Sequence, residues 1–121
     1  MGKAEWINGL FQSIDNSNTD AFLTFLSDDV TFRFGNAEPV KGKENVGNTV
    51  QGFFDSIKTL SHDLHEVWEH PDAVVCHGTV TYTRHDSTTL TVPFANVFGI
   101  NGNLVRDYRI FVDVSQLYNP A

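Results

Sequence analysis

The chain has 121 residues, of which 40% are hydrophobic and 19% are charged, a balance typical of one globular domain spanning residues 1–121. Fifteen acidic residues against eight basic ones give a formal net charge of -7. Because nucleic acids and anionic membranes are bound through clustered Lys and Arg, this excess of acid argues against both as partners. No apolar run approaches the roughly 20 residues of a membrane span, and the N-terminus lacks a signal-peptide core, so we expect a cytoplasmic protein.

The first half of the chain carries mainly helical periodicity. Apolar residues recur at helical spacing over residues 3–15, which predicts an amphipathic helix. The segment DNSNTD breaks this pattern, and Asn18 or Thr19 is the candidate N-cap of a second short helix with an apolar stripe over residues 22–26. A strand around residues 31–34 ends at GNAEP, and helical spacing resumes within residues 41–58.

From Leu60 onward the pattern becomes that of β-strands. Four strand-like runs cover residues 60–69, 73–85, 89–100 and 103–114, and the turn signals HPD, DSTT and NG separate them. Three helices and one early strand, followed by a four-stranded meander, predict an α+β fold.

The last hairpin predicts a mixed polar face. A two-residue Asn101-Gly102 turn of type I′ would fix the strand register. Asn96 would then lie opposite Asp107, with Arg109 on the same face, while the other face is largely apolar and suits a helix layer or a subunit contact. Burying amide, carboxylate and guanidinium groups without partners costs several kcal/mol. The cluster is therefore either a self-satisfied structural group or the wall of a ligand cavity.

Four residues are candidates for catalysis. Asp107 is the candidate general base, because apolar surroundings would raise its pKa toward the working range, although a nearby cation would lower it. Arg109 suits an anionic or carbonyl oxygen, and the Asn96 amide can donate to the same oxygen. His77 lies in mid-strand and could exchange a proton, oriented by Glu66 if the HPD turn is tight; a hydrogen-bonded core histidine is the alternative.

Metal and thiol chemistry are not expected. The remaining histidines form no HExxH motif, and His62 and His65 would point to opposite faces of a strand, so we expect neither a metal nor another cofactor. Cys76 is the only cysteine. Its run AVVCHGTVTY favours a buried strand thiol over a nucleophile, and no internal disulfide can form.

Two strings, FLSDDVTFRFGNAEPVKGKENV and GNLVRDYRIFVDVSQL, resemble the nuclear transport factor 2-like superfamily and its SnoaL-like members, and the likeness covers nearly the whole chain. That resemblance implies a cone in which a curved, mostly antiparallel sheet wraps around three N-terminal helices and encloses an apolar pocket. It also implies that Asp107, Arg109, Phe111 and Asp113 point inward. The expected ligand-binding residues are Trp6, Leu10, Phe34, Phe53, Trp68, Phe94 and Phe111.

The sequence lacks the catalytic residues of two enzyme groups that belong to this superfamily. Leu10 and Phe34 stand where the ketosteroid isomerases have their catalytic Tyr and Asp, and Asn96 stands where they have a protonated Asp. The positions that match the limonene epoxide hydrolase triad are His77, Thr79 and Arg109. Neither mechanism is therefore expected in its usual form.

The resemblance nevertheless implies a function in small-molecule chemistry. We expect a small, mostly apolar ligand carrying a carbonyl or carboxylate, and cofactor-independent proton transfer of the isomerase, cyclase or dehydratase type. A non-catalytic carrier or sensor and a dimerisation module are the alternatives. We also expect a homodimer formed through the open sheet face.

Overall fold

The structure is a computed structural model that describes residues 4–118. Its helices are α1 (Ala4–Asp15), α2 (Thr19–Leu23) and α3 (Lys43–Asp55). Its strands are β1 (Leu26–Phe34), β2 (Val40–Lys41), β3 (Thr59–His70), β4 (Ala73–Thr83), β5 (Thr89–Asn101) and β6 (Leu104–Val112). The predicted α+β fold is confirmed, and the short β2 is an addition to the elements expected from the sequence.

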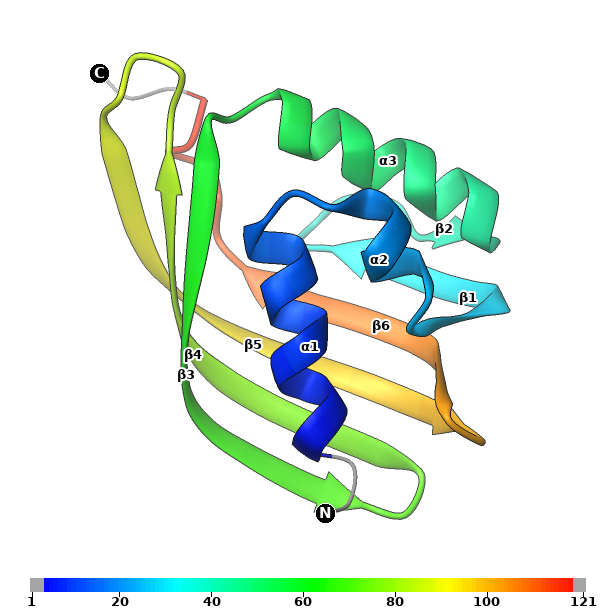
Figure 1. Ribbon diagram of the computed structural model, residues 1–121. Helices are drawn as coiled ribbons and strands as arrows, with labels where there is room; N and C mark the ends of the chain where they lie inside the picture. Colours follow the sequence, from blue (N-terminus) through cyan, green and yellow to red (C-terminus); the bar gives the residue numbers. More distant parts are fainter. Residues whose placement is uncertain (1–3, 119–121) are drawn as a thin grey trace.

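All six strands form one sheet in the order β2-β1-β6-β5-β4-β3. Neighbouring strands run antiparallel except β1 and β6, which pair in parallel. The sheet curves around α1, and α3 lies along the same concave side (Figure 1). The concave face and the helices together give the cone that was expected.

The start of α2 follows the predicted capping rule. Asn18 is the N-cap, and its side chain accepts a hydrogen bond from the backbone N–H of Ala21 at 3.1 Å. This bond satisfies one of the backbone donors that a helix leaves free at its start. The helix is shorter than expected, because Leu26 already begins β1.

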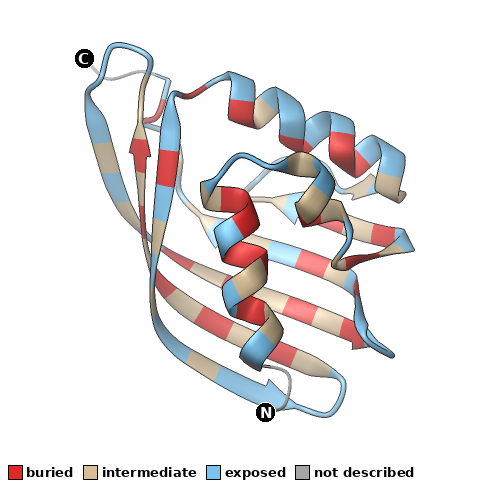
Figure 2. Cartoon of the chain, viewed as in Figure 1, coloured by how far each residue is buried: buried red, intermediate tan, exposed pale blue. Residues whose placement is uncertain are grey.

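The core lies between the concave face and the helices. In β4, buried and partly buried residues alternate along the whole strand, so successive side chains point to opposite faces (Figure 2). The apolar stripe of α1 supplies Ile7, Leu10, Phe11 and Ile14 to this core. Cys76 is also fully buried, as its sequence context predicted.

Gly78 allows β3 and β4 to approach closely where the sheet bends. A Cβ atom at this position would overlap the backbone carbonyl oxygen of Asp63 on the neighbouring strand. The register of β3 on β4 shifts nearby, between Leu64 and Glu66. A side chain is therefore excluded at Gly78 by backbone, which cannot move aside as a flexible side chain can.

The predicted register of the last hairpin is wrong. The turn occupies Gly102 and Asn103, since Asn101 pairs with Leu104. Moving the turn by one residue would, by itself, still leave Asp107 on the same face of the sheet as Asn96. However, Ile100 pairs with Val105 while Gly99 pairs with Asp107, so Arg106 is an extra residue in β6. This β-bulge turns every later side chain of β6 to the opposite face.

The bulge consequently exchanges the two faces of β6. Asn96 pairs with Ile110, and Tyr108 and Val112 share its concave face. Asp107, Arg109 and Phe111 lie on the convex face, contrary to the expected inward position. Arg109 Nη2 lies 3.2 Å from Asp107 Oδ2, so the two charges pair with each other.

The β3–β4 turn is tight, and Glu66 pairs with His77 as predicted for that case. However, His77 lies on the convex face of the sheet, on the side away from the helices. Its ring stacks on Trp68 with a centroid separation of 5.4 Å and an interplanar angle of 19°. His62 and His65 point to opposite faces, as expected from their spacing: His65 meets His77, and His62 meets Phe94.

Within residues 4–118, no helix is long and apolar enough to cross a membrane. The same residues contain no cluster of three or more His, Cys, Asp or Glu that could hold a metal ion.

Candidate functional site

A cavity of about 750 Å³ lies between the concave face of the sheet, α3 and the segment after β6. Its wall is mostly apolar, which is typical of small-molecule sites of this size. Six phenylalanines contribute to the wall: Phe22, Phe32, Phe34, Phe53, Phe54 and Phe94. Polar side chains from the long strands join them, including His62, Tyr82, Asn96 and Tyr108.

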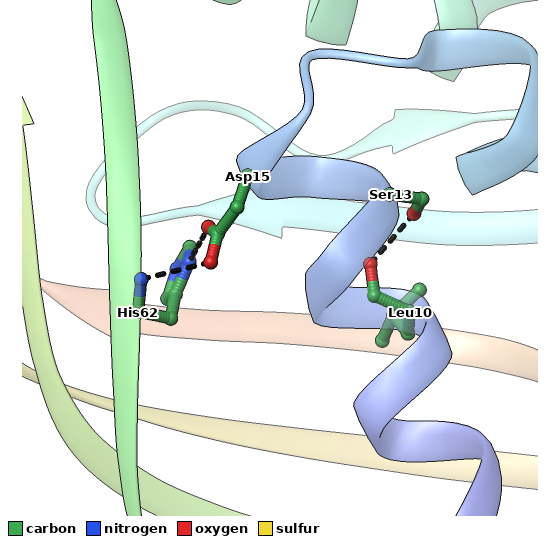
Figure 3. A network of polar contacts seen from close by, with 4 residues as sticks. All are labelled: Leu10, Ser13, Asp15 and His62. Carbon is green, nitrogen blue, oxygen red and sulfur yellow. Dashed lines mark hydrogen bonds and ion pairs between the residues drawn. The ribbon is translucent and has the colours of Figure 1, made fainter.

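Asp15, the last residue of α1, holds His62 at two points. Its Oδ1 lies 2.6 Å from His62 Nδ1, and its Oδ2 accepts a hydrogen bond from the His62 backbone N–H at 3.0 Å. Figure 3 shows the carboxylate bridging the ring and the strand backbone. The imidazole orientation is therefore fixed from α1, across the interface between helix and sheet.

The position of His62 follows from the alternation of β3. Leu60, His62 and Leu64 point to the same side of the strand, and Leu60 is buried. The rings of Phe11 and Phe94 pack against the imidazole at centroid distances of 4.7 and 5.1 Å. The His62 side chain is only 11% exposed, so it is enclosed by aromatic groups on the cavity wall.

This pairing determines which nitrogen of His62 can act on a ligand. An ionised carboxylate only accepts hydrogen bonds, so the Nδ1 facing Asp15 carries a hydrogen. The other nitrogen, Nε2, is then the proton acceptor of the neutral ring. An imidazole oriented by a carboxylate in this way can take a proton from a ligand while the carboxylate stabilises the imidazolium formed.

Asn96 is the polar residue of the central strands. It is only 2% exposed, and its Oδ1 has no hydrogen-bond partner. Most buried side-chain polar atoms are hydrogen-bonded, so an unpaired one calls for an explanation. Asn96 lines the cavity, while its Oδ1 is itself enclosed by protein atoms.

Tyr82 and Tyr108 add two phenol groups to the cavity wall. Burial raises the pKa of both well above the ordinary value, and Tyr108 is only 1% exposed. Both phenols are therefore protonated at neutral pH and can donate a hydrogen bond.

The mouth of the cavity is bordered by the segment after β6. Asp113 accepts a hydrogen bond from the Ser115 backbone N–H at 2.9 Å, which keeps the pKa of the Asp113 carboxyl below its usual range. Asp113 thus caps the backbone of this segment and also lies at the rim of the cavity. The Tyr118 hydroxyl lies 2.8 Å from Ser56 Oγ, which connects this segment to the end of α3.

Arg84 fixes the same segment from the end of β4. Its Nε donates to the Leu117 carbonyl at 2.8 Å, and its Nη2 donates to the Gln116 carbonyl at 2.9 Å. Leu117 is 1% exposed, so the segment is anchored by burial as well.

The structure brings some of the predicted site residues together and separates others. Asn96, Phe34, Phe53 and Phe94 line the cavity. Their roles in binding stay predictions.

The other predicted residues lie elsewhere. Leu10 is fully buried in the core, and Trp6 packs against Phe25 and Phe98; neither lines the cavity. Five more lie on the convex face and cannot act inside the cavity: Asp107, Arg109, His77, Trp68 and Phe111.

Sequence reasoning missed the pair of Asp15 and His62. One signal was present, because Leu60, His62 and Leu64 alternate and so place His62 on an apolar face. A second was the position of Asp15, one helical turn after the core residue Phe11. Their mutual contact joins residues 47 positions apart, which no local pattern specifies.

Comparison with known proteins supports the architecture. A curved sheet and helices around one cavity define the nuclear transport factor 2-like fold. One similar structure is a protein of this fold and unknown function from Burkholderia pseudomallei, with a TM-score of 0.87 and 14% identity, covering 97% of this chain and 95% of that one.

The SnoaL-like domain model matches residues 7–108, and the chain belongs to this family. A putative SnoaL-like polyketide cyclase from Jannaschia sp. CCS1 has a TM-score of 0.83 and 17% identity, covering 96% of this chain and 88% of that one. An LEH-like epoxide hydrolase from M. tuberculosis has a TM-score of 0.80 and 13% identity, covering 96% of this chain and 86% of that one. At these identities the likeness shows the fold alone. A search of curated proteins found no match.

Proposed function

We propose that this protein binds a small, mostly apolar molecule in its cavity and catalyses cofactor-independent proton transfer on it. The observation that carries the proposal is the Asp15–His62 pair on the wall of an apolar cavity. In this role His62 replaces the residues expected from the sequence, because His77 and Asp107 lie on the other face of the sheet. The reaction class is the isomerase, cyclase or dehydratase type that was expected.

The step assigned to His62 is removal of a proton from the carbon beside a ligand carbonyl. The Nε2 lone pair takes the proton, and the electron pair of the broken C–H bond moves to the carbonyl oxygen as an enolate. Asp15 stabilises the imidazolium, which then returns the proton to another ligand atom. The apolar surroundings strengthen these electrostatic contacts, because little water competes for them.

Deuterium exchange tests this step without knowledge of the natural substrate. In D2O, a bicyclic ketone such as 2-tetralone should exchange the hydrogens beside its carbonyl faster with the protein than without it, as measured by proton NMR. His62→Gln should slow the catalysed exchange about 100-fold or more, because general base catalysis contributes roughly that much. His77→Gln is the matched control, since His77 lies on the convex face, and it should keep the wild-type rate.

Equal exchange rates for the wild type and His62→Gln would refute catalysis by His62. If the exchange rates were equal and the ketone still bound to the protein, the result would favour the non-catalytic carrier function instead. That alternative is favoured by Leu10 and Phe34, which stand where the ketosteroid isomerases have catalytic groups.

We also propose that the convex face joins two copies of this chain. Trp68 and Phe111 are 53% and 56% exposed there. Partly buried Val75 and Val97 continue the patch from Trp68 across β4 and β5, and Phe111 is a diagonal neighbour of Val97 on β6. Exposed aromatic groups that form a continuous patch are typical of interaction sites.

The charges at the two sides of this patch favour a second copy as the partner. Arg33 and Arg109 are adjacent on β1 and β6, whereas Asp63 and Glu66 are exposed on β3. A two-fold axis lying in the interface and parallel to the strands would set the β6 side of one copy against the β3 side of the other. Opposite charges would then meet at both ends of the interface.

Light scattering coupled to size exclusion tests this interface. We expect a dimer for the wild type and a monomer for Val97→Glu, because the new carboxylate would be buried at the centre of the patch. Asn103→Glu, in the β5–β6 turn, is the control and should remain dimeric. A monomeric wild type would refute the proposal. The cytoplasmic location and the extent of a single domain over residues 1–121 stay predictions.

A further inference from the structure

We propose that Gly52 on α3 is a specificity-determining residue for the cavity. Its missing side chain leaves the mouth of the cavity open, so the protein accepts an elongated ligand whose far end lies in that mouth. This inference rests on the proposed binding function and narrows its ligand class by length.

The mouth is defined by the residues that both line the cavity and are exposed to solvent. They come from three segments, namely the β1–β2 loop, α3 and the segment after β6. Asn36 and Ala37 are the exposed lining residues of the loop, and Thr49, Gly52 and Ser56 are those of α3 and its C-cap. The cavity therefore opens between this side of α3 and the other two segments.

Gly52 forms its part of the wall with backbone atoms alone, because glycine has no side chain. Thr49 and Ser56 stand about one turn before and one turn after it and also line the cavity, so this side of α3 is turned toward the mouth. Apart from adjacent residues and the backbone of α3, no heavy atom of the described structure would lie within 4 Å of a Cβ atom at Gly52. A side chain at this position would therefore extend into the opening.

Packing explains the other glycine of this helix but not Gly52. Gly47 is buried, and a Cβ atom there would lie 2.9 Å from Leu23 Cδ1, so the close approach of this side chain favours glycine. Gly52 has neither such a contact nor a positive φ. Glycine within a helix lowers stability relative to alanine, because its backbone loses more conformational freedom on folding. At Gly52 no packing offsets this loss, and the feature that the glycine preserves is the open mouth.

A hydrogen bond closes the neighbouring part of the mouth. The Tyr118 hydroxyl lies 2.8 Å from Ser56 Oγ, so the segment after β6 is joined to α3 one turn beyond Gly52. Arg84 holds the same segment by donating to the carbonyls of Gln116 and Leu117. The part of the mouth that is left untied along α3 is therefore the part beside Gly52.

The ligand class follows from this shape. The interior is mostly apolar and carries His62 on its wall, so it receives an apolar ring system and the carbonyl on which His62 acts. The opening beside Gly52 lets the far end of the molecule continue toward solvent. The favoured ligand is thus a ketone that carries an arm of several carbon atoms on its ring system. Contact of this arm with the mouth removes further apolar surface from water.

Two ketones that differ only in the length of their arm test this selection by displacement of the neutral dye Nile red. They are 6-methoxy-2-tetralone and 6-hexyloxy-2-tetralone, which share the rings, the carbonyl and the ether oxygen. We expect the wild type to bind the hexyloxy compound at least about tenfold more tightly, since burial of two further methylene groups is sufficient for a factor of this size.

Two substitutions at Gly52 and one control assign the preference to this position. Gly52→Leu should remove most of the advantage of the hexyloxy compound and leave binding of the methoxy compound within about twofold, because the new side chain occupies only the mouth. Gly52→Ala should reduce the same advantage by a smaller factor. Asn48→Leu adds the same side chain at an exposed position of α3 that does not line the cavity, so it should change neither affinity. Urea denaturation should show Gly52→Leu to be more stable than the wild type.

The results separate this inference from the proposed function. If neither Nile red nor either ketone binds the wild type, the accessible cavity and both proposals are refuted. If the ketones bind but the wild type does not prefer the longer one, or Gly52→Leu leaves their ratio unchanged, only the selection by length is refuted. Gly52→Ala gives this answer even if Gly52→Leu does not fold, and the exchange assay with His62→Gln judges the proton transfer independently.

Discussion

The bridge between Asp15 and His62 makes a quantitative prediction for Asp15→Asn. The carboxylate accepts from His62 Nδ1 at 2.6 Å and from the His62 backbone N–H at 3.0 Å. An amide has only one acceptor oxygen, so one of the two donors must face an NH2 group instead. The substitution therefore loses at least one charge-assisted hydrogen bond in a region where the side chains are 11% and 27% exposed.

The expected loss of stability is about 2 kcal/mol, because a hydrogen bond to a charged group contributes about 1.5–3 kcal/mol. For a chain of this size that corresponds to a fall in Tm of roughly 6–10 °C. Urea denaturation followed by circular dichroism measures the free energy of unfolding. Asp107→Asn is the control: its pairing with Arg109 is substantially exposed, so the loss should stay below about 1 kcal/mol.

The same substitution should change the imidazole itself. With an amide NH2 facing Nδ1, the neutral ring favours the tautomer that carries its hydrogen on Nε2, and the acceptor on the cavity side is lost. Nitrogen-15 NMR of His62 distinguishes the two tautomers, and the catalysed deuterium exchange should fall with the change. The reasoning is refuted if Asp15→Asn is as mild as Asp107→Asn and the tautomer does not change.

Three further predictions concern stability and thiol reactivity. Gly78→Ala should lower the free energy of unfolding by about 3 kcal/mol or more in urea denaturation, because its Cβ would meet backbone. Gly52→Ala should instead stabilise α3 by up to about 1 kcal/mol, since nothing lies within 4 Å of the added atom. Similar values for the two variants would contradict this packing argument. Burial raises the pKa of Cys76 from 9.0 to about 12, and it also raises the pKa values of Tyr82 and Tyr108. The stability that comes from burying these neutral groups is therefore complete below about pH 8, and it falls as the pH rises from there toward the folded-state values. Between about pH 8 and about pH 10.5, Cys76 alone should lower the free energy of unfolding by about 2 kcal/mol, and an unchanged urea midpoint would contradict this expectation. Native Cys76 should also react with a thiol reagent at pH 8 only as fast as the chain unfolds, because the thiol is buried and un-ionised, so rapid labelling without denaturant would disprove its burial.

The fold was largely predictable because its elements have clear periodicities. Residues 3–15 repeat at helical spacing, and turn residues separate the four long strands, so the α+β order followed from local patterns. The parallel pairing of β1 with β6 did not, because it joins segments far apart in the chain. Nor did the first residues of β1, since Leu26 continues an apolar stripe that also fits a helix.

The candidate site was less predictable, because the facing of β6 depends on one extra residue. Asn96 was correctly placed among apolar neighbours, but the bulge at Arg106 puts Asp107 and Arg109 on the convex face of the sheet, away from the cavity. Nothing in the string LVRDYR marks a bulge, since a regular strand could carry the same residues. His62 could have been preferred to His77 from its alternation with leucines, whereas the partner Asp15 required the packing of α1 on β3.

The bulge at Arg106 also gives this strand an unusual route to new chemistry. In a regular β6 that kept Arg106, the far half of the strand would have the opposite parity, which would bring an acid and a guanidinium into the hollow and turn Tyr108 toward solvent. Deleting Arg106 itself would remove the bulge and leave Tyr108 opposite Phe98. We hypothesise that the gain or loss of one bulge, rather than substitution of the side chains, can therefore determine which set of groups faces the cavity. Solvent accessibility of Tyr108 in a folded variant that lacks Arg106 would test the idea: a ring that turned toward solvent would count against it. For enzyme design, the length of this strand is then as useful a variable as its composition.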